Sequence, residues 1–375
     1  MFRAEIYRVF SRKAGLAAML AGLFFILYYT MGNTVWGEGL VDEGRIYYGK
    51  EAIRRDKEIA AEFSGPLTED VVRAIWEKYG PPVNYANRST TKEGLEAAAA
   101  TGGNDNYCNR AMTSLFGEEI VGEDGEVTYA LAEGWTESRY LQGGYTFGYT
   151  GSSRWFWDRF MMAYQLAYIT IIVFLCPMFS EDYAFRTTDI ILPAAKGRFR
   201  LWRLRLAVGC FLASAYYWLA CGSIFLLYIA YYGTEGLSVS CGLAGVPMFF
   251  PEDDISMGKG LLMLYLCGWA AAVVLAALVC AVSAASRQSF SSLVRSLALY
   301  IGPFAFMRLV LDSLPRGRVN SLLHMICYSM PLSFCGSYVE VSHGERWLMA
   351  AVALAAAVSG AAVSARRYCH HQVGR

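Results

Sequence analysis

The sequence predicts an all-α polytopic membrane protein with six transmembrane helices and a mainly helical, α or α+β, extracytoplasmic domain between helices 1 and 2. Hydrophobic side chains make up 55% of the 375 residues and charged ones only 17%, which is too apolar for an ordinary soluble enzyme. The apolar residues cluster in six stretches that approach or exceed the roughly 20 residues a helix needs to cross a bilayer. Only about residues 32–159 have the composition of a soluble domain.

The predicted spans are Gly15–Met31, Phe160–Phe179, Leu206–Tyr232, Gly260–Ala285, Leu297–Leu314 and Trp347–Ala365. A cleaved signal peptide is the alternative for the first, but Tyr28–Met31 does not resemble a small-residue cleavage site, so a retained span is favoured. Either interpretation places residue 33 onwards outside. The apolar stretch Leu322–Phe334 is too short to cross the bilayer and contains Pro331. We expect it to form a helix that enters and leaves the membrane from the outer side.

Positively charged residues indicate the orientation of the spans. With the N-terminus inside, the inner segments carry 15 Lys and Arg residues and the short outer loops carry four. Lys and Arg are enriched in cytoplasmic loops of membrane proteins. Residues 33–154 carry 20 acidic against 12 basic residues, a net charge of −8. The pattern predicts a multi-pass protein of the plasma membrane with both termini in the cytoplasm.

Three regions follow from this topology. Residues 1–31 form the cytoplasmic N-terminus and helix 1, 32–159 the extracytoplasmic domain, and 160–375 helices 2–6 with a basic cytoplasmic loop at 180–205. Within the outer domain, helices are predicted over Tyr48–Phe63, Leu67–Tyr79 and Glu93–Ala100, with Thr68 as the N-cap of the second. Loops or short strands are predicted over Gly122–Tyr149.

The ten cysteines do not resemble a disulfide framework. Most lie in apolar stretches, where cysteine behaves as a small hydrophobic residue, and Cys108 is alone in the long charged region. Cys241 and Cys335 fall in predicted outer loops, so a disulfide between them is left open. Arg308 and Asp312 are an ionisable pair within a predicted span, four residues apart on one helix face. They predict either a polar lining of a substrate path or the end of a span with Arg308 extended to the interface.

The loop at 180–205 is where we expect function. The chain contains no GxxxxGK[ST] motif, so ATP hydrolysis by that mechanism is not expected of it. The four histidines lie near or beyond the ends of spans, and no catalytic or metal-binding spacing occurs. Residues Glu181–Leu192 lack Gly and Pro and are predicted to form a short helix, with Pro193 and Gly197 following it. The six basic residues of the loop are interpreted as topology anchors.

The pattern F-S-E-D-Y-x-x-x-T-T-D-I-I-L-P-x-x-x-x-R, from Phe179 to Arg198, resembles the permeases of type-2 ATP-binding-cassette exporters. In that family an acidic residue, an aromatic residue and a Thr-containing helix precede a small-residue turn and basic residues. Arg186 stands where the family commonly has Gly. The six-span layout and the short helix before the last span are similar as well, and the large outer domain resembles those of some Gram-positive members.

The resemblance implies a permease subunit that exports a small molecule, lipid or peptide. A separate cytoplasmic ATPase would dock on loop 180–205 and bind the ATP and Mg, with no cofactor in this chain. The implied coupling residues are Glu181, Asp182, Tyr183, Arg186, Thr187, Thr188, Ile190 and Ile191. In this hypothesis Glu181, Asp182 and Arg186 make polar contacts with the ATPase. Further implied partners are the bilayer and a second permease, as a homodimer or heterodimer, and no nucleic acid.

A second hypothesis is a membrane sensor or assembly protein that acts through its extracytoplasmic domain. A neighbouring reading frame with a Walker motif would favour the exporter, and a kinase or cell-wall enzyme would favour the sensor. An embedded enzyme is disfavoured because the predicted spans contain no acid, base or metal-ligand set.

Overall fold

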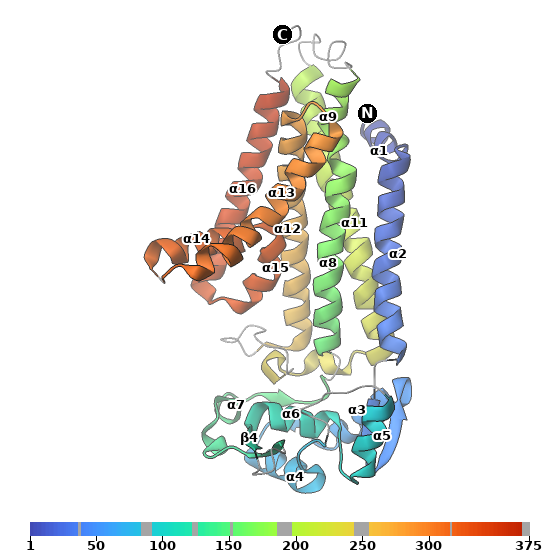
Figure 1. Ribbon diagram of the computed structural model, residues 1–375, viewed down its shortest axis with the longest axis vertical. Helices are drawn as coiled ribbons and strands as arrows, with labels where there is room; N and C mark the ends of the chain where they lie inside the picture. The colour runs from blue at the N-terminus through green and yellow to red at the C-terminus, as the bar shows by residue number, and fades with distance from the viewer. Residues whose placement is uncertain are drawn as a thin grey trace. The chain divides into compact units, whose positions relative to one another are not determined.

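The structure is a computed structural model that describes residues 1–36, 39–83, 92–121, 127–150, 153–185, 197–243, 255–315 and 317–369. The described chain is mainly helical (Figure 1). It divides into two compact units. Unit 1 comprises residues 1–27, 160–224 and 263–375, and unit 2 comprises 28–159 and 225–262.

Six of the described helical segments are long and apolar enough to cross a membrane, so the chain is a multi-pass α-helical membrane protein. They are α2 (Lys13–Trp36), α8 (Ser153–Leu175) with the short α9 (Pro177–Ala184), α11 (Gly197–Tyr232), α12 (Met257–Ala285), α13 (Ser289–Leu309) with the 3-10 turn Leu311–Ser313, and α16 (His343–Cys369). The number and approximate positions agree with the prediction. Helix α11 begins nine residues earlier than predicted, so residues 197–205 are helical rather than loop.

Helices α8 and α12 are the most buried spans of unit 1, whereas α2, α13 and α16 are the most exposed. Buried tyrosines connect the central helices. The Tyr168 hydroxyl of α8 donates to the Gly268 carbonyl of α12 at 2.6 Å, and the Tyr217 hydroxyl of α11 donates to the Tyr265 carbonyl at 3.0 Å. These bonds satisfy polar groups that would otherwise be costly inside an apolar bundle. The exposed apolar side chains of α2, α13 and α16 suit contact with lipid.

A pair of short helices lies between α13 and α16 in unit 1 (Figure 1). They are α14 (Arg318–Tyr328) and α15 (Pro331–Glu340), with 11 and 10 residues. Both are too short to cross a bilayer, as predicted for this part of the chain. Proline is favourable in the first turn of α15 because that turn needs no backbone N–H donor. Helix α14 packs on α13 through Met307, Leu311 and Cys327.

Unit 2 combines short helices with β-hairpins. The strands form three antiparallel pairs, β1 (Gly39–Asp42) with β2 (Arg45–Tyr48), β3 (Gly65–Pro66) with β6 (Thr146–Phe147), and β4 (Gly117–Val121) with β5 (Val127–Leu131). The helices are α3 (Gly49–Ala61), α4 (Glu69–Tyr79), α5 (Lys92–Ala100), α6 (Tyr107–Phe116) and α7 (Arg139–Gln142). Short 3-10 turns cover Trp135–Glu137, Glu235–Ser238 and Cys241–Leu243.

Helix periodicity and capping residues correctly predicted three helices of residues 32–159. Thr68 caps α4, its hydroxyl accepting from the Val71 N–H, and Gly80 ends the helix with a φ of 64°. Helices α3 and α5 lie where they were predicted. Helix α6 was not predicted. It begins at a reciprocal pair, because the Asn106 and Asn109 side chains each accept from the backbone N–H of the other at 3.0 Å.

The structure answers the open question about cysteines. Cys241 and Cys335 are both free and buried. Burial raises the pKa of the Cys241 thiol to about 12, so this side chain is a neutral, unreactive thiol at physiological pH. Cys108 is likewise buried in α6, consistent with its interpretation as a small hydrophobic residue.

Candidate functional site

The candidate site is built on α9. This helix is separated from α8 by a break in the helical hydrogen bonding at Pro177. Pro177 has no backbone N–H, which interrupts the helical hydrogen bonding after α8. The Cys176 thiol donates instead to the Val173 carbonyl at 3.2 Å. From α12, the Ser283 hydroxyl accepts from the N–H groups of Phe179 and Ser180 at 2.9 and 3.1 Å and donates to the Cys176 carbonyl at 2.7 Å. Ser283 therefore satisfies first-turn N–H groups of α9 that lack a helical partner.

Asp182 on α9 is the centre of the site. Both of its carboxylate oxygens accept from Arg205 of α11. Nη1 of Arg205 reaches Oδ2, and its Nη2 donates to Oδ1 at 3.2 Å. The Tyr368 hydroxyl of α16 also donates to Oδ2, at 3.1 Å. The Arg205 and Asp182 side chains are only 2% and 5% exposed. A two-point guanidinium–carboxylate pair in such surroundings is both strong and geometrically specific.

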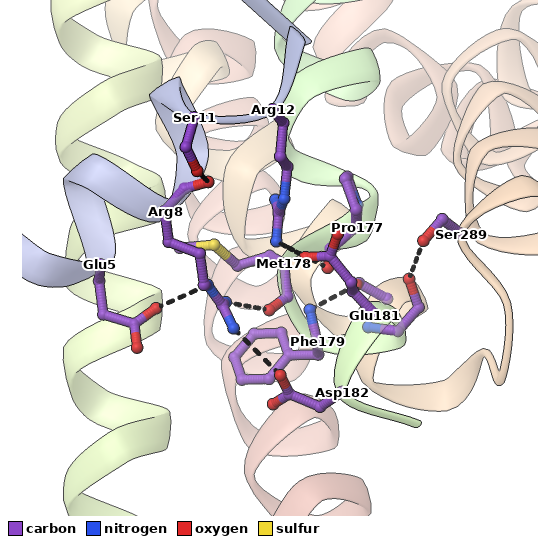
Figure 2. A network of polar contacts seen from close by, with 12 residues as sticks. Glu5, Arg8, Ser11, Arg12, Pro177, Met178, Phe179, Glu181, Asp182 and Ser289 are labelled. Carbon is purple, nitrogen blue, oxygen red and sulfur yellow. Dashed lines mark hydrogen bonds and ion pairs between the residues drawn. The ribbon is translucent and has the colours of Figure 1, made fainter. Parts of the chain in front are cut away.

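A third helix reaches Asp182 from the N-terminus. Arg8 lies on α1 (Phe2–Phe10), and its Nη1 donates to Asp182 Oδ1 at 3.0 Å, as Figure 2 shows. Its Nη2 donates to the Met178 carbonyl at 2.7 Å. Glu5 of α1 then lies between two arginines, with its carboxylate 3.2 Å from Arg8 Nε and 3.3 Å from Arg205 Nε. Asp182 therefore connects α9 to α1, α11 and α16.

A neighbouring ion pair completes the cluster. Arg12, just after α1, pairs with Glu181 and lies 3.5 Å from the Pro177 carbonyl (Figure 2). We call the set Glu5, Arg8, Arg12, Glu181, Asp182, Arg205 and Tyr368 the α9 network. It contains three guanidinium groups and three carboxylates, so its formal charges balance. Balance matters because a buried charge without a partner is strongly unfavourable.

Aromatic rings enclose the network. The guanidinium carbon of Arg205 lies 5.7 Å from the ring centroids of both Phe179 and Tyr368. These two rings meet edge to face with centroids 5.0 Å apart. Such rings exclude water while attracting the cation, which strengthens the ionic contacts inside. Burial and the adjacent Arg205 guanidinium lower the pKa of Arg8, and the neighbouring carboxylates of Glu5 and Asp182 oppose that shift.

The structure describes three of the predicted coupling residues. Glu181, Asp182 and Tyr183 lie on α9, which ends at Ala184. Arg186, Thr187, Thr188, Ile190 and Ile191 lie outside the described residues, as does most of the predicted helix Glu181–Leu192. Asp182 is buried and bonded within the chain, and Glu181 pairs with Arg12. The prediction that this stretch contacts an ATPase stays a prediction.

The interpretation of the six basic loop residues as topology anchors does not account for the contacts of Arg205. This side chain is buried and ion-paired because α11 extends back to Gly197 and carries it into the bundle. Glu5, Arg8 and Tyr368 were also missed. One sequence signal was present. Glu5 is the single acid among the basic residues of the first segment, and an isolated acid of this kind indicates pairing rather than solvation.

The other predicted pair lies on α13 and the turn after it. Arg308 Nη1 is 3.3 Å from Asp312 Oδ2, and the two side chains are 63% and 40% exposed. His324 of α14 adds a third group, its Nε2 lying 3.0 Å from Asp312 Oδ1. The hydrogen bond to Asp312 raises the pKa of His324. This cluster fixes the α13–α14 corner, and its exposure matches the span-end interpretation better than a polar lining.

No protein-family model, curated protein or solved structure matches this chain. The functional argument therefore rests on the sequence and on the geometry of the α9 network.

Proposed function

We propose that this chain is the membrane-spanning permease subunit of an ATP-binding-cassette exporter. In this proposal a separate ATPase docks on loop 180–205 and hydrolyses ATP, and a second permease, identical or similar, completes the transporter. The α9 end of unit 1 then faces the cytoplasm of a cell with the chain in its plasma membrane. The support from the sequence is the resemblance of residues Phe179–Arg198 to the coupling loop of type-2 permeases.

One structural observation carries the proposal. Asp182, which follows directly on Glu181 at the start of the proposed docking loop, is held by side chains of α1, α11 and α16. Because these bonds all end on Asp182, α9 cannot shift unless the three other helices move with it or the bonds to them break. A force applied to the loop is therefore transmitted to the spans. In the proposal Asp182 transmits motion, whereas Glu181 and Arg186 contact the ATPase.

The first test asks whether an ATPase binds. The tagged chain is expressed with any Walker-motif protein encoded beside it and purified in mild detergent. We expect a stable complex whose ATPase rate differs from that of the ATPase alone. The double variant Glu181→Ala with Arg186→Ala should lose most of this binding while still inserting into the membrane. A normal complex and normal transport in that variant would remove both side chains from the proposal.

The second test separates transmission from docking. Arg205→Lys keeps the charge but loses the two-point geometry with Asp182. We expect this variant to bind the ATPase normally but to lose most of the coupling between ATP hydrolysis and transport. Arg203→Lys, on the same helix two residues away, is the matched control. If no Walker-motif protein binds and the outer segment binds a cell-wall component instead, the sensor hypothesis replaces the exporter.

A further inference from the structure

Helix α13 carries a hydroxyl-bearing face that the α9 network does not use. Its buried side chains are Ser292, Ser296, Tyr300 and Met307. The three hydroxyl residues are spaced four apart and so share one helix face. At 1.5 Å of rise per residue they extend over roughly 12 Å of the helix. This face points into unit 1, because the three side chains are at most 2% exposed.

These hydroxyls have no hydrogen-bond partner among the residues that the structure describes. A serine inside a helix usually satisfies itself on the carbonyl four residues back, as Ser286 does with Val282 at 2.8 Å. Buried polar atoms without a partner are rare in folded proteins, and each one calls for an explanation. Three in register on one face form a row of hydroxyl groups that could bind a ligand.

The hydroxyl face continues toward both ends along neighbouring helices. Before it, the Ser289 hydroxyl lies 3.4 Å from that of Ser180 on α9. After it, the Tyr300 ring meets the Tyr168 ring of α8 edge to face, with centroids 6.2 Å apart. We call Ser289, Ser292, Ser296, Tyr300 and Tyr168 the hydroxyl seam. It runs from the base of the α9 network into the spans.

Helix α13 is built to bend beside this seam. Pro303 lies inside the helix and deprives the Leu299 carbonyl of its usual donor, which weakens the helix there. A side chain added at Gly302 would meet nothing within 4 Å, so the backbone is open at the same turn. Helix α13 is also among the least buried spans.

We propose that the hydroxyl seam binds an uncharged, hydroxyl-bearing substrate such as a polyol or the sugar headgroup of a glycolipid. The inference rests on the proposed exporter function and names its substrate class. Each serine and tyrosine hydroxyl both donates and accepts, which matches the hydroxyls of such a molecule. The one charged side chain in this part of α13, Arg295, is exposed rather than directed into the seam, so the face offers nothing specific to an ion.

The test uses the purified chain in lipid nanodiscs without any ATPase. The probes are a photoactivatable alkyl glucoside and two analogues with the same tail, an alkyl sulfate and an alkyl trimethylammonium. Cross-linked peptides are mapped by mass spectrometry. We expect the glucoside to label residues 289–300 and α8 in preference to both charged probes. Removing the hydroxyls with Ser292→Ala, Ser296→Ala and Tyr300→Phe together should lower this labelling roughly tenfold, as expected for the loss of several neutral hydrogen bonds.

Ser286→Ala is the matched control, because that hydroxyl, one residue after α12, already donates to the Val282 carbonyl, and labelling should not change. Equal labelling by the charged probes, or undiminished labelling of the triple variant, would overturn the proposal. So would labelling confined to the outward face at Phe290 and Leu309, which are exposed apolar residues. If the triple variant does not fold, the single variant Tyr300→Phe is compared with Ser286→Ala instead. We then expect a severalfold loss of labelling by the glucoside probe.

The two proposals fail in different ways. If the probe labels the seam but no ATPase binds the chain, the exporter proposal fails and the binding-site proposal stands. If a functional ATPase complex forms but the probe does not label the seam, the binding-site proposal fails and the exporter proposal stands.

Discussion

Asp182 and Asp312 both pair with arginine in unit 1, and their surroundings differ in almost every respect. Asp182 and Arg205 come from different helices and are nearly inaccessible, and Arg8 and Tyr368 also bind Asp182. Asp312 and Arg308 are four residues apart and exposed to solvent, and Asp312 also contacts His324. Sequence spacing predicts the second pair easily and the first not at all. Spacing therefore finds ion pairs, whereas burial decides which of them hold the fold together.

The largest expected effect comes from removing the buried acid. Asp182→Asn leaves Glu5 as the remaining carboxylate that both Arg8 and Arg205 contact in the network. Breaking one partner of a buried pair typically costs about 3–5 kcal/mol. We expect a clearly lower midpoint of thermal unfolding in detergent. Asp312→Asn is the matched control at the exposed pair and should leave the midpoint almost unchanged. Equal shifts in the two variants would remove the contrast between the pairs.

Arg205→Lys should have the next largest effect. A lysine keeps the charge but offers one ammonium group instead of a planar fork, and it cannot reach Asp182 and Glu5 together. The loss corresponds to about 1.5–3 kcal/mol, the range for hydrogen bonds to charged groups. Arg308→Lys, its counterpart at the exposed pair, should be neutral. Thermal unfolding of both variants in the same detergent measures the difference, and an unchanged midpoint in Arg205→Lys contradicts the two-point pairing.

Tyr368→Phe is a smaller and more selective change. It keeps the ring that packs on Phe179 and removes the hydroxyl that donates to Asp182. We expect a destabilisation of roughly 1–2 kcal/mol, near the lower end for a bond to a charged acceptor. Tyr7→Phe on the exposed side of α1 serves as the control. If the two substitutions gave the same midpoint, the Tyr368 hydroxyl would have no share in the network.

The smallest expected effect is a pH dependence confined to the exposed cluster. Bonding to Asp312 raises the pKa of His324 above its ordinary value of 6.5. The stabilising contribution of the protonated imidazole is therefore fully present below about pH 6.5 and is lost as the pH rises through the raised value. Hydrogen exchange at the α13–α14 corner, corrected for the intrinsic rise of amide exchange with pH, should increase across that interval. The increase should disappear in Asp312→Asn, and its persistence there would assign the pH dependence to another group.

The sequence predicted the spans and most helices of unit 2 because those depend on local patterns. Apolar length located the six segments, and Thr68 with Gly80 marked the ends of α4. The α9 network could not be predicted in this way. Its members lie at positions 5, 8, 12, 181, 182, 205 and 368, and no periodicity relates them. Arg205 also appeared to belong to a loop, because the apolar run starts only after it, whereas α11 begins at Gly197.

The break between α8 and α9 has a consequence for the order of synthesis. Ser283, which holds the first turn of α9, follows Phe179 by 104 positions in the chain. The hydroxyl donor to Asp182 comes from Tyr368, 186 positions later. A ribosome therefore delivers α9 to the membrane well before α12 can hold it, and long before α16 completes the shell around its carboxylate. Arg8 and later Arg205 can reach Asp182 before Tyr368 has been made. The network can therefore close only after α16 has been inserted, so its closure reports the insertion of α1, α9, α11 and α16 together.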